Sequence, residues 1–563
     1  MWYAGQKGWV LGHSASMKSD KKCALVGIDV GTSGVRAVAV GPAGELLAEA
    51  EERIRQDYRP AGGIHEQDPG EWWQALCSVA QRIAKTLKEK SGEVELRGVA
   101  VTSTSGSLVV ADAQGLPLRP AILYDDGRGV EIAEELNEQA DPQSIRLGPS
   151  FSLVKAAWVR RQEPELWERT RYVLHPADWL SGKLSGEFGI SDFTNALKLG
   201  YDRESSSWIG SVHAACLLDY RLPIVRRPAE PIGQVSSVAA AETGLPAGMT
   251  VLAGATDGMA SVIASGAGRR GDANTTLGTT LVWKVLHDGK PAAHSGVYYH
   301  LHPGGLWVPG AASNTGLGSI GLPGRQSKIL RCCENSGHDP LTRPAPAGES
   351  ADAGHPLPQG GEGLFFVFKT GGEPKDHAIF AQNESETQVV SPADMDRLAA
   401  AYFPTSVVCY MLSGQGERFP FAHPKAESFV EGNPRDAGEF YAAQLQSIAF
   451  VERWGYETLE SCSVRVGDRV FSTGAAAKSP VLSQLRANVL DKTVIQPRYP
   501  TAAFGAAILA ATGTVFSGNI FHAIQSMTSI LESYHPSAVL VPAFDAVYRS
   551  FRDACARRGY ISR

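Results

Sequence analysis

Hydrophobic and polar residues alternate in short runs near the N-terminus, and apolar residues then recur with helical spacing. The alternating runs predict strands at 23–30, 35–40 and 46–54, and later at 97–102 and 108–111. Apolar positions three and four residues apart predict helices at 70–90, 131–139 and 153–161. Because strands alternate with helices, the pattern predicts an α/β layer architecture.

The pattern begins again in the middle of the chain. A strand at 249–253 leads through GATDG to a helix at 259–267, and a second strand–turn–strand follows at 274–286. We therefore predict a first lobe at 23–265 and a second lobe at 266–545. The second lobe continues with a strand at 467–474, a helix at 479–489 and a small-residue helix at 502–511, which could pack tightly against a neighbour.

Three segments lie outside this pattern. Residues 321–390 are rich in Pro, Gly, Ser and Glu and predict a low-complexity insertion, mostly loop, in the second lobe. Folded structure should resume with a helix at Ser391–Pro392. Residues 1–22 predict a disordered extension, with Met17 as an alternative start, and 546–563 a C-terminal tail helix.

Composition narrows the class of partner. The chain has 563 residues, a net charge of −6 and no block of basic residues, so nucleic acid and anionic membranes are not expected partners. Its eight cysteines form no C-x-x-C pair, which favours reduced thiols and a cytoplasmic location. No apolar stretch is long enough to span a bilayer.

Two Gly-Thr turns carry the first candidate chemistry. The first contains Gly31, Thr32 and Ser33 and the second Gly278, Thr279 and Thr280, each between two apolar strands. Such turns present free backbone N–H groups and hydroxyls to a phosphate. A third Gly-rich turn at Gly474 and Ala475 opens a helix, so the three turns together predict a nucleotide cradle.

Two aspartates complete the candidate site. Asp29 precedes the first turn, where a carboxylate beside a phosphate is suited to a divalent cation. Asp257 follows a strand end, where ligands collect in open α/β sheets, and could act as a general base towards a hydroxyl. An equally simple interpretation of Asp257 is a helix cap. We expect Asp257 to face Asp29 on the opposite wall of a gap between the lobes.

The motifs GIDVGTSGVRA, GATDGMASVIASGA, LGTT and STGAAAKSP, in this order, resemble the FGGY carbohydrate kinases. TSTSGSLVVAD, ILYDDGRG, HPADWLSGKLSGEFGISDFTNALKLGYD and GERFPF are similar to the cyanobacterial and plant pentulose-kinase branch, whose members act on D-ribulose or resemble xylulose kinases. The resemblance covers 23–320 and 391–545. It implies the two-lobed actin/Hsp70-type, ribonuclease H-like ATPase fold with a cleft between the lobes.

The resemblance also implies roles for individual residues. Asp257 would be the base towards the sugar hydroxyl, and Asp29 would help to hold Mg²⁺ through water. The phosphates and the adenosine would bind at Gly31, Thr32, Ser33, Gly278, Thr279, Thr280, Gly316, Gly474 and Ala475. The sugar would contact Ser105, Asp126, Arg128 and Asp257.

The implied activity is ATP- and Mg²⁺-dependent phosphorylation of a pentulose, D-ribulose first, at a terminal hydroxyl. D-Xylulose, another ketose or a polyol is the alternative substrate. A non-catalytic sensor that binds ATP and sugar is the alternative of another class. The expected partner is a small sugar, and the expected state is a monomer or a homodimer.

Overall fold

A computed structural model describes residues 22–320 and 392–561, except 56, 61–62, 91–93, 140–145, 216–218 and 292–293. It also describes two short paired strands, β19 (Phe366–Lys369) and β20 (Thr387–Val390). The predicted N-terminal extension and most of the predicted insertion at 321–390 lie outside these residues.

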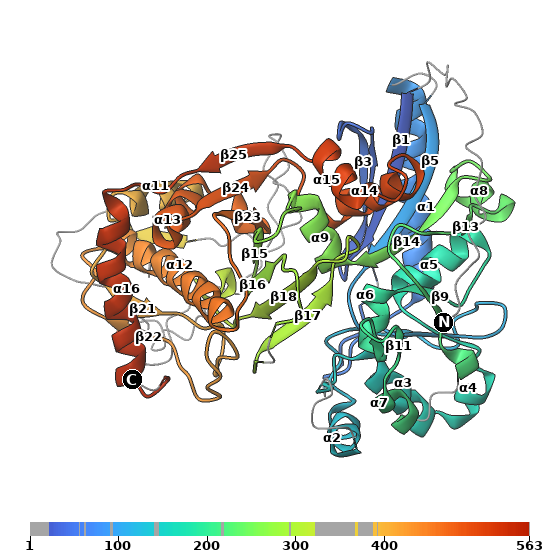
Figure 1. Ribbon diagram of the computed structural model, residues 1–563, viewed down its shortest axis with the longest axis horizontal. Helices are drawn as coiled ribbons and strands as arrows, with labels where there is room; N and C mark the ends of the chain where they lie inside the picture. Colours follow the sequence, from blue (N-terminus) through green and yellow to red (C-terminus); the bar gives the residue numbers. More distant parts are fainter. Residues whose placement is uncertain are drawn as a thin grey trace, which may run out of the picture.

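The first half of the chain is built on a six-stranded sheet, and we call this part lobe I (Figure 1). In spatial order its strands are β13 (Pro231–Gln234), β14 (Thr250–Thr256), β5 (Val94–Ser103), β1 (Lys22–Val30), β2 (Gly34–Val40) and β3 (Leu46–Arg53). β1, β2 and β3 form an antiparallel meander, whereas β1, β5 and β14 run parallel. The carboxyl ends of these three parallel strands therefore meet at one edge of the sheet.

The second half is built on a seven-stranded sheet, and we call this part lobe II. In spatial order its strands are β17 (Val297–Leu301), β18 (Trp307–Ala312), β16 (Leu281–Val285), β15 (Ala273–Leu277), β23 (Arg469–Thr473), β24 (Thr493–Pro497) and β25 (Ile530–Tyr534). β18, β16 and β15 are antiparallel neighbours, and β15, β23 and β24 run parallel. Both sheets thus contain a run of antiparallel strands, three in lobe I and four in lobe II, followed by two further strands that are parallel to the last of them.

Helices cover the faces of these sheets. Those of lobe I are α1 (Pro69–Lys90), α2 (Val130–Gln139), α3 (Ser152–Gln162), α4 (Pro164–Arg169), α5 (Pro176–Ser185), α6 (Phe193–Ala196), α7 (Gly210–Ala214), α8 (Ser237–Thr243) and α9 (Asp257–Ser265). Those that follow in the chain are α11 (Pro392–Ala400), α12 (Ala437–Ser461), α13 (Pro480–Leu490), α14 (Ala502–Thr514), α15 (Ile520–Met527) and α16 (Leu540–Arg557). The predicted strands and helices are found within a few residues of their expected bounds; the expected tail helix begins earlier, at Leu540.

Both lobes also contain short paired strands and 3₁₀ turns outside the two main sheets. The strands are β4 (Glu66–Gln67), β6 (Val109–Ala111), β7 (Ala121–Ile122), β8 (Tyr172–Leu174), β9 (Ile190–Asp192), β10 (Tyr201–Asp202), β11 (Ser207–Trp208), β12 (Ile224–Arg226), β21 (Val408–Tyr410) and β22 (Phe429–Glu431). The 3₁₀ turns are Leu197–Leu199, Asp219–Arg221, Leu317–Ser319 and Ala475–Lys478.

Helix α14 packs against the sheet of lobe I, although it lies late in the chain (Figure 1). Its small residues permit unusually close approach: a Cβ atom on Gly27 of β1 would lie 1.9 Å from the Ala503 carbonyl oxygen. A Cβ on Gly505 would lie 2.0 Å from the carbonyl oxygen of Ala260 in α9. The tight packing expected of this helix is therefore confirmed, and its partners belong to lobe I, whereas the predicted boundary at residue 266 had assigned α14 to the second lobe.

Apolar cores lie on both faces of the lobe I sheet and within lobe II. No helix among the described residues is both long and apolar enough to span a bilayer. Cys23, Cys77, Cys409, Cys462 and Cys555 carry free thiols.

Candidate active site

The two candidate aspartates lie at the same edge of the lobe I sheet. Asp29 is the residue before the last of β1, and Asp257 directly follows β14. Strand β5 lies between these two parallel strands. Thr102 of β5 donates a hydrogen bond to Asp29 Oδ1 at 3.1 Å. The expectation that Asp29 and Asp257 occupy opposite walls of a gap is wrong, because the parallel β1–β5–β14 order brings both to one edge.

Electrostatics couple the two carboxylates. Burial, and then the neighbouring Asp257, raise the pKa of Asp29 to about 7. Burial also raises the pKa of Asp257, although the Gly258 N–H and the Lys284 ammonium oppose that rise. Two acidic groups with raised pKa values at one sheet edge are typical of an active site.

A hydrogen-bonded chain in lobe I positions the strand that leads to Asp257. The Thr256 N–H donates to Thr194 Oγ1 at 2.9 Å, and Thr194 Oγ1 donates in turn to Asp192. Asp192 caps α6 by accepting from the N–H groups of Thr194 and Asn195. Asp257 itself accepts from the Gly258 N–H at 2.5 Å at the start of α9. The N-cap of α9 is Thr256, and no side chain caps this helix, so the helix-cap interpretation of Asp257 is wrong and Asp257 is the first residue of the helix.

Lys284 of lobe II reaches this edge from β16, and the sequence analysis missed it. Its Nζ donates to the carbonyl oxygen of Gly258 at 2.5 Å. Burial lowers the pKa of Lys284 to about 8, while the charge of Asp257 opposes that fall. The signal that could have found it is a lysine inside the apolar strand LVWKV.

The first Gly-Thr turn joins β1 to β2. The Gly31 N–H donates to the Gly34 carbonyl at 3.0 Å, and Gln67 donates to the Thr32 carbonyl at 2.7 Å. Ser33 is exposed at the tip. The turn is thus stabilised by a hydrogen bond within its own backbone and by a second one from the Gln67 side chain.

The second turn joins β15 to β16 and is supported by the segment that contains Gly316. A Cβ on Gly316 would lie 2.5 Å from the Thr279 carbonyl oxygen, so only glycine fits there. The Leu317 and Gly318 N–H groups donate to the carbonyls of Gly278 and Thr279. Gly316 therefore supports the turn through backbone contact.

Glu417 of the GERFPF motif anchors the start of that supporting segment. It is 4% exposed, and it accepts from the hydroxyl of Ser313 at 2.7 Å and from the N–H of Asn314 at 2.8 Å. Tyr410 donates to the same carboxylate. The GERFPF motif therefore supports the second turn through Ser313 and Asn314, although it lies far from that turn in the sequence.

The third turn lies beside the second because β23 is the parallel neighbour of β15. Gly474 has φ +90°, and a Cβ there would lie 2.4 Å from the Leu277 carbonyl oxygen. Thr473 and Thr276 share a hydrogen bond of 2.9 Å between their hydroxyls. The structure therefore brings Gly278, Thr279, Gly474 and Ala475 to one edge of lobe II.

Besides Asp257, the residues expected to bind sugar are Ser105, Asp126 and Arg128, and they differ in whether their polar atoms already have partners. The hydroxyl of Ser105, in the loop after β5, is buried and has no hydrogen-bond partner among the described residues. Asp126 accepts from the His65 N–H at 2.7 Å, and its two oxygens pair with the Arg128 guanidinium at 2.9 and 2.8 Å. Arg128 also pairs with Glu66 at 2.6 Å. The Ser105 hydroxyl is thus left without a partner among the described residues, whereas Asp126 and Arg128 bind each other.

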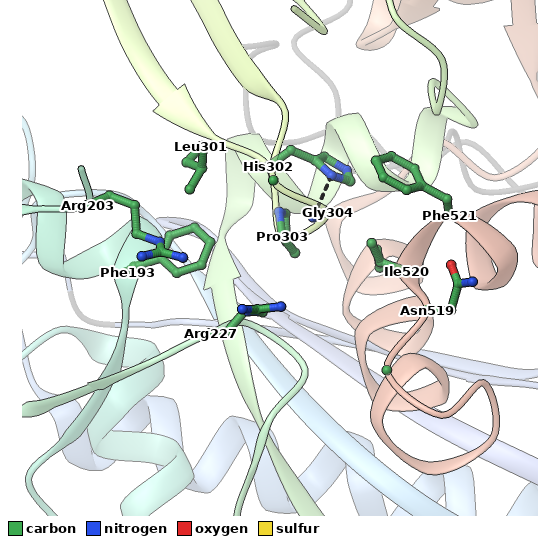
Figure 2. Close-up of a pocket in the computed structure, with 12 residues that line it drawn as sticks. Phe193, Arg203, Arg227, Leu301, His302, Pro303, Gly304, Asn519, Ile520 and Phe521 are labelled. Carbon is green, nitrogen blue, oxygen red and sulfur yellow. Dashed lines mark hydrogen bonds between the residues drawn. The ribbon is translucent and has the colours of Figure 1, made fainter. Parts of the chain in front are cut away.

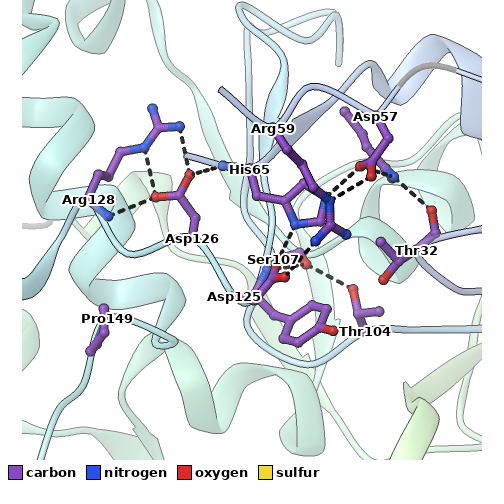
Figure 3. Close-up of polar contacts among 12 residues, drawn as sticks. Thr32, Asp57, Arg59, His65, Thr104, Ser107, Asp125, Asp126, Arg128 and Pro149 are labelled. Atoms are coloured by element: carbon purple, nitrogen blue, oxygen red, sulfur yellow. Dashed lines mark hydrogen bonds and ion pairs between the residues drawn. The ribbon is translucent and has the colours of Figure 1, made fainter. Parts of the chain in front are cut away.

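A second polar group links the first turn to the loop after β7, which contains Asp125 (Figure 3). The ring nitrogens of His65 lie 2.5 Å from Asp125 Oδ1 and 2.5 Å from Asp57 Oδ1. Gln67 contacts both Asp57 and the Thr32 carbonyl, and Arg59 pairs with Asp57 at 2.7 Å. No sequence pattern marks this group, because its members are polar residues in short or irregular segments.

No cluster of three or more His, Cys, Asp or Glu side chains suited to a metal occurs among the described residues. Mg²⁺ commonly takes one or two carboxylates together with waters and substrate phosphates. The Asp29–Asp257 edge supplies that number of carboxylates.

Comparison with known proteins adds to this geometry. The profile of the FGGY family of carbohydrate kinases, N-terminal domain, matches residues 24–264, and that of its C-terminal domain matches 369–514. Xylulose kinase of Escherichia coli (strain K12) is 30% identical over 287 residues, which are 49% of this chain and 58% of that enzyme. Xylulose kinase of Staphylococcus epidermidis is 24% identical over 521 residues, which cover 91% of this chain and 92% of the relative.

Solved structures share the fold. A xylulose kinase from Brucella ovis superposes with a TM-score of 0.74 at 22% identity and covers 94% of this chain and 98% of its own. Plasmodium falciparum glycerol kinase with ADP has a TM-score of 0.74 at 15% identity and covers 95% of this chain and 98% of its own. These likenesses confirm the predicted two-lobed actin/Hsp70-type fold.

Proposed function

Because this chain belongs to the FGGY family of carbohydrate kinases, we propose that it phosphorylates a pentulose, D-ribulose first, at a terminal hydroxyl with ATP as donor. That it is a sugar kinase, a phosphotransferase of the xylulose and glycerol kinase type, follows from the family. The choice of sugar and the roles of individual residues are our proposal.

The observation that carries the proposal is the sheet edge that holds Asp29, Asp257 and the unpartnered Ser105 hydroxyl. Asp257, in its ionised form, accepts the proton of the attacking sugar hydroxyl. Ser105 hydrogen-bonds the sugar and fixes its orientation. Asp29 would help to hold Mg²⁺ through water, which would neutralise charge on the transferred phosphoryl group.

The turns of lobe II hold the nucleotide in this proposal. Gly278, Thr279 and Thr280 offer N–H groups and hydroxyls to the β- and γ-phosphates, and Gly474 and Ala475 line the adenosine side. Gly31, Thr32 and Ser33 approach the same phosphates from lobe I. Lys284 joins the lobes beside Asp257, and its ammonium favours the ionised form of that carboxylate by opposing the rise of its pKa. Water is excluded when the lobes close, which limits hydrolysis of ATP.

D-Xylulose is the second candidate substrate because the relatives named above are xylulose kinases. A coupled assay of ADP release with D-ribulose, D-xylulose, L-ribulose and glycerol separates these possibilities, and detection of the sugar phosphate confirms transfer. We expect the highest kcat/KM for D-ribulose. Faster turnover of D-xylulose would replace that assignment, and turnover of glycerol alone would refute the pentulose proposal.

Ser105→Ala tests the sugar side. Loss of one hydroxyl contact should raise the KM for the pentulose about tenfold, since a hydrogen bond in a buried site contributes on the order of 1 kcal/mol. The KM for ATP should not change. An unchanged sugar KM would remove Ser105 from the binding site.

A further inference from the structure

A cavity of about 310 Å³ lies between the lobes, outside the residues assigned above to sugar and nucleotide (Figure 2). Its walls come from three parts of the chain. Lobe I contributes Phe193, Arg203 and Arg227, lobe II contributes the turn 301–305 after β17, and the α14–α15 connection contributes 518–521. A cavity of this size is at the lower end of those that bind small molecules.

The charged side chains that line the cavity are basic. Arg203 and Arg227 line it, and no lining residue is an aspartate or a glutamate. The guanidinium of Arg203 packs over the Phe193 ring at 4.8 Å and donates to Ser206, but its buried Nε–H has no partner among the described residues. Arg227 is exposed, and its nearest carboxylate, Glu230, is 4.0 Å away. Both arginines therefore retain donors for an anion.

His302 adds a buried donor to the same wall. Its side chain is fully buried and stacks on Phe521 at 5.2 Å between ring centroids. Burial lowers the pKa of His302 to about 3, so the ring is neutral near pH 7. Because Nδ1 accepts from the Gly304 N–H at 3.0 Å, the proton of the neutral ring lies on Nε2. That Nε2 is buried and has no partner in the described structure.

We propose that this cavity binds a small organic phosphate, as a second site distinct from the active site. Arg203 and Arg227 pair with the phosphate oxygens, and the His302 Nε2–H donates to the ligand. Leu301, Pro303 and Ile520 cover its organic part. A neutral molecule would leave Arg203 without an anionic partner and Arg227 with only its 4.0 Å ion pair to Glu230, so the phosphate is the part that is recognised.

The position of the cavity predicts an effect on catalysis. Its walls belong to both lobes, and an ion pair between Glu204 of lobe I and Lys290 of lobe II crosses the same interface at 2.8 Å. A ligand that contacts both lobes stabilises the relative lobe position seen here. Binding should therefore change the affinity for ATP, and by linkage ATP should change the affinity of the ligand by the same factor.

The test is calorimetric titration of the full chain with ribose 5-phosphate, with ribose as the uncharged counterpart and inorganic phosphate as the minimal probe. The main variant is Arg227→Gln, because an exposed side chain can be replaced without loss of folding. Arg226→Gln is the matched control, since Arg226 is also exposed and adjacent but does not line the cavity.

We expect saturable binding of ribose 5-phosphate and no binding of ribose. Arg227→Gln should weaken the binding about tenfold, which corresponds to about 1.4 kcal/mol, and Arg226→Gln should leave it unchanged. Affinity for ATP should be the same in both variants. Equal affinity of both variants for the phosphate ester, or no saturable binding by the wild type, would overturn the proposal.

Discussion

The two lobes carry the same strand arrangement but different chemistry at corresponding positions. Two residues before the glycine of each Gly-Thr turn, lobe I has Asp29 and lobe II has Thr276. Each residue pairs in register with a threonine on the parallel neighbour, Thr102 in lobe I and Thr473 in lobe II. Thr102 donates to the Asp29 carboxylate, whereas Thr276 and Thr473 share a hydroxyl–hydroxyl bond.

This difference indicates a division of labour. Both carboxylates, Asp29 and Asp257, lie at the edge of lobe I, where the proposed proton transfer and metal binding would need negative charge. At the position that corresponds to Asp29, lobe II presents a neutral hydroxyl, and the turn that follows offers backbone N–H groups, which accommodate phosphates without repulsion. Each of the following substitutions changes the proposed site in one of the two lobes.

The largest effect should follow Asp257→Asn. The substitution removes the proposed base but retains the hydrogen bond capacity of the side chain, so kcat should fall about 10³-fold. Binding of ATP, measured by calorimetry, should remain. A variant that retained turnover within a few-fold of the wild type would show that Asp257 is not the base.

Asp29→Asn should have the next largest effect, since it gives lobe I the neutral character of lobe II. We expect kcat to fall about 10²-fold and the Mg²⁺ concentration for half-maximal rate to rise, because one of two carboxylates near the phosphates is lost. Thr276→Ala is the corresponding change in lobe II and should reduce kcat far less. Equal losses in the two variants would contradict the division of labour.

Lys284→Met tests the link between the lobes through the pH profile. In the wild type, kcat/KM should fall as the pH drops below about 7, where Asp29 takes up a proton. The Lys284 ammonium opposes the rise in the pKa of Asp257, so its removal should raise that pKa further, and protonation of the proposed base should then reduce kcat/KM at a higher pH than in the wild type. An alkaline limb near pH 8, from loss of the Lys284 proton, should disappear.

Lys284→Arg is the control, because it keeps the positive charge. A profile that was the same in Lys284→Met and the wild type would show that the contact with Gly258 has no electrostatic role in catalysis.

Gly474→Ala should produce the smallest of these effects on turnover. A side chain in this left-handed conformation costs roughly 1–2 kcal/mol, and its Cβ would also clash with the Leu277 carbonyl. The KM for ATP should rise about tenfold and the melting temperature should fall by several degrees. Gly414→Ala is the control, since no atom would lie within 4 Å of its Cβ. Equal behaviour of the two variants would remove Gly474 from the cradle.

The sequence predicted the parts of the molecule that local patterns encode. The strand–turn–strand units, α1 and the small-residue α14 follow from periodicity and composition. The placement of Asp29 and Asp257 at one edge did not follow, because it depends on the spatial order β1–β5–β14. The contacts of Lys284 with Gly258 and of His65 with Asp125 were missed because these partners are distant in the sequence.

The hydrogen-bond partners of the residues expected to bind sugar could not be predicted from the sequence either. Ser105, Asp126 and Arg128 were equivalent candidates as polar residues near strand ends. Tertiary contacts then saturate Asp126 with Arg128 and His65, and leave Ser105 without a partner. Such differences arise from packing between segments and have no local signal.

The most direct test is a crystal structure with D-ribulose and a non-hydrolysable analogue of Mg·ATP. The account predicts that a carboxylate oxygen of Asp257 lies within hydrogen-bond distance, roughly 2.6–3.2 Å, of the sugar's terminal hydroxyl oxygen. The γ-phosphate should contact the turn at Gly278–Thr280, and the sugar's terminal hydroxyl oxygen should lie between Asp257 and the γ-phosphate. A sugar hydroxyl bound away from Asp257, or a γ-phosphate that does not contact lobe II, would contradict it.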